Sequence, residues 1–173
     1  MSHTVAGLLA MASSFVAAIL VAVWYVAPWL RDRPARTALT ALAWVHVFRY
    51  VALQVLTAQS HGLGISDALR DQIMYGDLAC AALALAAVVA LRMRPSVARW
   101  PLWLLVVATV VDLANAAIGG LREGALETAS GWSWMILAFY VPALWVGTAL
   151  VVWVLVTRGG ELVRGGGSRL TAR

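Results

Sequence analysis

Five apolar runs, each about as long as a membrane-spanning helix, constrain this chain of 173 residues more than any other feature. The hydrocarbon core of a bilayer is about 30 Å thick, so a helix needs roughly 20 mainly apolar residues to cross it. The runs cover residues 5–30, 37–58, 73–92, 101–120 and 133–157. They predict an all-α fold, an integral membrane bundle of five transmembrane helices.

The composition agrees with lipid as the main solvent of the chain. Only 12% of the residues are charged, whereas soluble domains average about 25%. The net charge of +5 does not indicate nucleic-acid binding, because the arginines lie mainly between the apolar runs and near the C-terminus. One domain is therefore expected over residues 1–158, with a flexible cytoplasmic tail over residues 159–173.

Arginine is distributed unevenly among the connections between the runs. The first and third connections and the C-terminal segment hold ten of the thirteen arginines, and the second and fourth hold only Arg70 and Arg122. By the positive-inside rule, this alternation predicts that the N-terminus lies outside and the C-terminus in the cytoplasm. Every basic residue is Arg rather than Lys, which we interpret as the codon bias of a GC-rich bacterium. The expected location is the bacterial inner (cytoplasmic) membrane, as a multi-pass protein.

Three ionisable side chains lie inside the apolar runs. Arg49 belongs to the second run, Asp77 to the third and Asp112 to the fourth. Such groups cost several kcal/mol in a membrane unless they are paired, so they mark a candidate functional site. With the rise of an α-helix, all three would lie roughly 17–22 Å above the cytoplasmic boundary. We expect one polar cluster in the outer half of the bundle.

Four more polar residues have a helical phase and depth that suit this cluster. The expected members are His46, Arg49, Tyr50, Asp77, Asp112, Asn115 and Tyr140. As a binding site, the Arg49 guanidinium can clamp a carboxylate or phosphate, and a histidine such as His46 titrates near neutral pH. As a structural feature, the same groups can pair with one another and fix helix register. Both interpretations stay open.

The sequence predicts no catalytic residue, metal or cofactor. A bis-histidine haem site needs a second buried histidine, and His3 and His61 lie outside the predicted spans. The single cysteine, Cys80, excludes an intramolecular disulfide and CxxC-type metal sites. No Gly-rich phosphate loop or serine–histidine–aspartate order is present.

Short motifs surround the predicted cluster and occur in a recognisable order. They are His46-x-Phe48-Arg49-Tyr50, Tyr75-Gly76-Asp77, Asp112-Leu113-x-Asn115 and Tyr140-x-Pro142. Over about residues 8–157, the chain resembles an uncharacterised family of small bacterial five-helix membrane proteins that carries these segments. The resemblance implies a fold and a set of marked residues, but no activity.

Three classes of function stay open at this point. In the first, the polar cluster binds or carries a small ligand, an anion or a proton, and the protein forms a homo-oligomer. In the second, the protein is an accessory or scaffold subunit of a larger membrane complex, and the cluster is structural. In the third, which we favour least, it is an intramembrane enzyme that uses aspartate and histidine as acid and base. The expected partners are the lipid bilayer, a small-molecule ligand and either further copies or a membrane complex.

Overall fold

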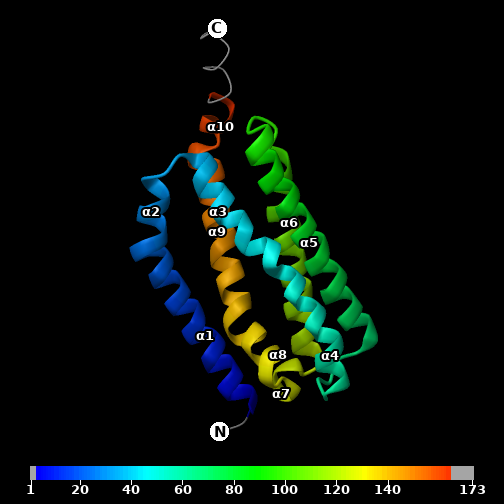
Figure 1. Cartoon of the computed structure of the whole chain (residues 1–173). Helices are drawn as coiled ribbons and strands as arrows, with labels where there is room; N and C mark the ends of the chain where they lie inside the picture. Colours follow the sequence, from blue (N-terminus) through cyan, green and yellow to red (C-terminus); the bar gives the residue numbers. More distant parts are fainter. Residues whose placement is uncertain (1–2, 165–173) are drawn as a thin grey trace.

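A computed structural model of the protein describes residues 3–164 and shows an all-α bundle, with no strand among these residues (Figure 1). Within them, five helices are long and apolar enough to cross a membrane by length and composition: His3–Arg31, Ala35–Ser60, Asp67–Met93, Arg99–Arg122 and Gly131–Arg158. Each contains one of the five predicted runs and extends it by a few residues. The chain thus has the form of a multi-pass membrane protein, as the sequence predicted.

Three of these long helices change their winding along the way. The first consists of α1 (His3–Val21), the π-helical η1 (Ala22–Val26) and α2 (Ala27–Arg31). The second consists of α3 (Ala35–Val47), the 3₁₀-helical η2 (Phe48–Leu53) and α4 (Gln54–Ser60). The third and fourth are α5 (Asp67–Met93) and α6 (Arg99–Arg122). The fifth consists of α8 (Gly131–Met135), the π-helical η3 (Ile136–Tyr140) and α9 (Val141–Arg158), with the short α7 (Ala125–Thr128) before it and α10 (Gly160–Arg164) after it.

Both π-helical segments end two residues before a proline. Proline has no N–H and therefore leaves a backbone carbonyl of the preceding turn without its helical donor. A local π turn is one way in which a membrane helix accommodates this interruption. The N–H of Ala27, before Pro28, donates to the carbonyl of Ala22. The N–H of Val141, before Pro142, donates to that of Ile136 in the same way.

Helix α9 has a central position, because it contacts α1, α3 and α6 (Figure 1). The larger apolar core lies toward the end of the bundle that carries the C-terminus and includes Leu39, Leu91 and Leu102. A smaller core at the opposite end includes Val55 and Leu69. Arg49, Asp77 and Asp112 lie on the second, third and fourth long helices, between the parts of the bundle that form these two cores.

The segment after α9 continues into structure instead of the predicted flexible tail. Residues 160–164 form α10, and Leu162 is buried in the larger core. Glu161 accepts hydrogen bonds from Arg158 Nε and from the backbone N–H of Ala35, at 2.7 and 3.0 Å. The tail prediction is thereby corrected for residues 160–164, because an apolar contact and charged hydrogen bonds attach them to the bundle. Residues 165–173, the rest of the predicted tail, lie outside the described residues.

Candidate functional site

Arg49 is fully buried and contacts a polar group with each of its three guanidinium nitrogens. Its Nε donates to Asp77 Oδ1 at 2.5 Å, and its Nη2 donates to Asp112 Oδ2. Its Nη1 donates to Thr109 Oγ1 at 3.2 Å. Three helical segments, η2, α5 and α6, therefore meet at one guanidinium. The buried salt bridge that the sequence predicted is present, and it includes both carboxylates.

The 3₁₀ winding of η2 explains how Arg49 reaches this position. Every third residue along this part of the second helix is buried: Ala43, His46, Arg49, Ala52 and Val55. In an α-helix, residues three apart drift around the axis because one turn takes about 3.6 residues. A 3₁₀-helix has three residues per turn, so residues at positions i and i+3 eclipse each other. The winding thus keeps Arg49 and Ala52 on the buried face.

Two predicted members lie outside the cluster. Tyr50, next to Arg49, is 49% exposed. Asn115, which follows Asp112 on α6, is also exposed. Neither makes a side-chain hydrogen bond to Arg49, Asp77 or Asp112 in the part of the chain that the structure describes. For Tyr50, the prediction assumed a regular α-helical phase, whereas η2 is 3₁₀-helical. For Asn115, whose helix α6 is regular, the prediction assumed a broader polar face than the structure shows.

His46 and Tyr140 lie next to the ion pairs but make no hydrogen bond to them. His46 is 1% exposed, and its Nδ1 has no hydrogen-bond partner among residues 3–164. The Tyr140 hydroxyl donates to the backbone carbonyl of Val45 at 3.1 Å. Tyr140 therefore ties η3 to α3, and its ring forms part of a cavity wall.

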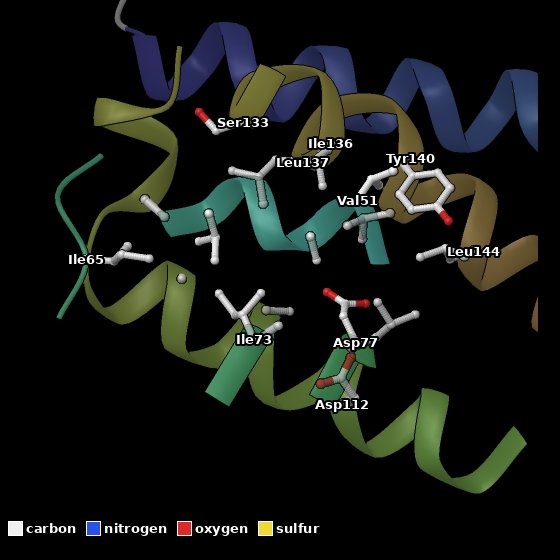
Figure 2. A pocket seen from close by; sticks show the side chains of 18 of the residues that line it. Val51, Ile65, Ile73, Asp77, Asp112, Ser133, Ile136, Leu137, Tyr140 and Leu144 are labelled. Carbon is white, nitrogen blue, oxygen red and sulfur yellow. The ribbon is translucent and has the colours of Figure 1, made fainter. Parts of the chain in front are cut away.

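A cavity of about 270 Å³ lies beside the two carboxylates. In Figure 2, Asp77 and Asp112 lie together in one part of it, while Ser133 and Ile65 lie farther along its length. Its other walls are mainly apolar and come from all five long helices. Helices that surround a concave, largely apolar space with a few polar groups are typical of small-ligand sites.

The carboxylates, not the guanidinium, are accessible from this cavity. The side chains of Asp77 and Asp112 are 15% and 10% exposed, and both line the cavity. The Arg49 side chain is 0% exposed and does not line it. With His46 neutral, one guanidinium and two carboxylates give the cluster one excess negative charge. The arrangement therefore suits a hydrogen-bond donor or a cation better than the anion that we considered from the sequence.

Two residues of the cluster were not among the predicted site residues. Thr109 lies one turn before Asp112 and is 0% exposed. Gly76 precedes Asp77, and a Cβ atom there would overlap the Asp112 carboxylate. Their spacing from the aspartates was the available signal, but small residues and threonines are common throughout the spans. Among the described residues, no group of three or more His, Cys, Asp or Glu side chains is placed to hold a metal ion.

Comparison with known proteins identifies the family. The chain belongs to the family described as domain of unknown function DUF8737, whose model matches residues 6–156. No curated protein and no solved structure matches the chain. The match includes all or most of each of the five long helices and the whole polar cluster, so the cluster lies within the family domain.

Proposed function

We propose that this protein is a binding or carrier protein for a small ligand that occupies the cavity beside Asp77 and Asp112. The observation that supports the proposal is the position of the carboxylates. A purely structural pair would need one acid for Arg49, whereas here two acids share the guanidinium and both face the cavity. Buried ionisable groups in membrane helices commonly mark ligand or ion pathways.

The proposal includes the location and orientation expected from the arginine distribution. With the N-terminus outside and the C-terminus in the cytoplasm, the cavity lies in the outer half of a bacterial inner membrane. Ile65, which lines the cavity, belongs to the second connection. Ser133, which also lines it, lies at the start of the last long helix, directly after the fourth connection. These connections are on the outer side in this orientation. A ligand would thus be held nearer to the periplasm than to the cytoplasm.

A neutral probe that fits the apolar walls tests whether the cavity binds ligands. We expect saturable binding of about one 1-hexanol per chain by isothermal titration calorimetry in lipid nanodiscs, after subtraction of empty nanodiscs. Ala116→Phe and Ala52→Met, which enlarge two cavity-lining residues, should abolish it. Val111→Phe, on the exposed face of α6, should not. Absence of saturable binding to the wild type, or equal binding to the filled variants, would contradict the proposal.

A second candidate function is an accessory subunit of a membrane complex. It is favoured by the full pairing of Arg49 and by the apolar surface of the first long helix. In the most apolar stretch of this helix, only 11% of the residues are buried against the rest of the described chain. In that case a partner would cover α1, and the cavity would have no occupant. Purification in mild detergent with a stoichiometric partner, together with absence of hexanol binding, would favour this alternative.

A further inference from the structure

A groove on the surface of the bundle adjoins the cavity. The two share four lining residues: Val51, Gln54, Ile136 and Tyr140. The groove is completed by Trp132, Met135 and Phe139, which are 76%, 46% and 60% exposed. It therefore lies between the second helix, at η2 and α4, and the start of the fifth, at α8 and η3, and these two helices touch at α4 and α8.

The lining of this groove is suited to molecules that are already in the bilayer. Apart from the Gln54 amide and the Tyr140 hydroxyl, the side chains of its seven residues are apolar or, in Trp132, largely so. It belongs to two helices that would span the membrane. An ion in water would gain little from such a path, whereas an amphiphile could keep its apolar part in contact with lipid and side chains.

The charge of the cavity wall at Asp77 and Asp112 determines which amphiphiles would bind. The carboxylates of Asp77 and Asp112 are accessible there, while Arg49 is fully buried behind them. One excess negative charge at low dielectric is unfavourable unless a proton or another cation neutralises it. An anion would face the two carboxylates in this part of the cavity. A single positive charge on the ligand would complete the cluster.

We propose that the ligand is a small amphiphile with one positive charge, which reaches Asp77 and Asp112 sideways from the bilayer through this groove. This inference rests on the proposed function and adds the chemical class of the ligand and its route. At a pH where the empty cluster holds a neutralising proton, that proton leaves the carboxylates as the cation binds. The other titratable groups that interact with Arg49, Asp77 or Asp112 are His46, Cys80 and Tyr140.

Three probes with the same six-carbon chain test the chemical class. Hexylammonium, 1-hexanol and hexanoate would be titrated into the full chain in nanodiscs of neutral phosphatidylcholine. We expect hexylammonium to bind at least tenfold more tightly than hexanol and hexanoate to bind most weakly. Between pH 6 and 8, only hexylammonium affinity should rise, since a primary amine of pKa about 10 stays charged over this range. Equal affinities of the amine and the alcohol would overturn the inference and leave the proposed function intact.

A conservative substitution separates the charge from the shape of the cavity. Asp112→Asn removes the excess charge and leaves the Arg49–Asp77 ion pair in place. Hexylammonium should then bind within about threefold of hexanol when the two affinities are compared in this same variant. Unchanged preference for the amine in this variant would contradict the role of the carboxylates. Failure of all three probes to bind the wild type would contradict the proposed function as well.

The sideways route is tested by association rates. Met135 lines the groove but not the cavity, so Met135→Trp should slow association of hexylammonium and hexanol by the same factor, with little effect on their affinities. Val107→Trp is the matched control, because Val107 is 58% exposed on α6 and lines neither space. Equal association rates for the Met135 variant, the Val107 variant and the wild type would show that the ligand takes another route.

Discussion

Gly76 on α5 lies directly against the Asp112 carboxylate on α6, so closely that a Cβ atom at Gly76 would overlap it. The absence of a side chain at this one position lets Asp112 approach α5 and meet Arg49 together with Asp77. Small residues commonly allow membrane helices to approach closely. Here the close approach also assembles the charged cluster.

Gly76→Ala should therefore destabilise the protein by displacing Asp112. We expect a loss of about 1–3 kcal/mol in the free energy of unfolding, the usual cost of overpacking a filled site. Thermal unfolding in detergent measures it. Gly120→Ala on α6 is the control, because its Cβ would meet Ala125 at an ordinary 3.6 Å. Alanine is favoured over glycine in helices by about 1 kcal/mol, so equal melting temperatures for the two variants would contradict this account of Gly76.

Arg49→Ala should be the most destabilising single substitution in the cluster. It leaves Asp77 and Asp112 buried together without their cation, and removal of one partner of a buried pair typically costs about 3–5 kcal/mol. Replacing all three charges, as in Arg49→Met with Asp77→Asn and Asp112→Asn, leaves no charge uncompensated and should recover most of this stability. Thermal unfolding in detergent measures both variants. If Arg49→Ala kept the wild-type melting temperature, or if the triple variant were less stable than Arg49→Ala, charge pairing would not be what Arg49 provides.

The fold could be predicted from the sequence because few backbone structures can satisfy their hydrogen bonds inside a bilayer. Apolar runs of about 20 residues leave little alternative to helices that satisfy their own backbone hydrogen bonds. The meeting of Arg49, Asp77 and Asp112 could be predicted for a related reason, since unpaired charges are costly at this depth. Both predictions depend on large free energies that hold whatever the details of packing.

The details that were missed depend on small differences in helix winding and side-chain shape. Tyr50 was placed with Arg49 because the prediction assumed about 3.6 residues per turn, and η2 winds more tightly. The role of Gly76 depends on the distance between α5 and α6, which no single residue reveals. The cavity is likewise a property of five packed helices, and its access to Asp77 and Asp112 but not to Arg49 could not be read from their spacing.

Thr109→Val tests the third contact of the Arg49 guanidinium. The substitution keeps the shape of the side chain but removes the oxygen that accepts from Nη1, leaving a buried charged donor without a partner. We expect a loss of about 1–3 kcal/mol. Thr148→Val is the matched control on α9, because the hydroxyl of this buried threonine donates only to the carbonyl of Leu144 in its own helix. The melting temperature of Thr109→Val should be lower than that of Thr148→Val, and the reverse order would contradict the contact with Arg49.

Glu161 joins the C-terminal helix α10 to the start of α3 and should make stability depend on acid pH. It accepts hydrogen bonds from Arg158 and from the N–H of Ala35, the first residue of α3, where a negative charge also suits the helix dipole. Chiefly the Arg158 side chain, and then the Ala35 N–H, lower the pKa of Glu161 below its ordinary value of 4.5. The folded state thus favours the carboxylate.

The sign of the effect follows from this lowered pKa. The contribution of Glu161 is fully present above the ordinary value of 4.5 and is lost as the pH falls through the lower pKa of the folded state. Glu161→Gln should therefore lower the melting temperature in detergent at neutral pH, and the difference from the wild type should shrink in acid. The side chain is 48% exposed, so the loss should not exceed about 1 kcal/mol. In an Arg158→Gln background, the same substitution should have a smaller effect. A difference that grows as the pH falls would mean that protonated Glu161, not the carboxylate, stabilises this end of the bundle.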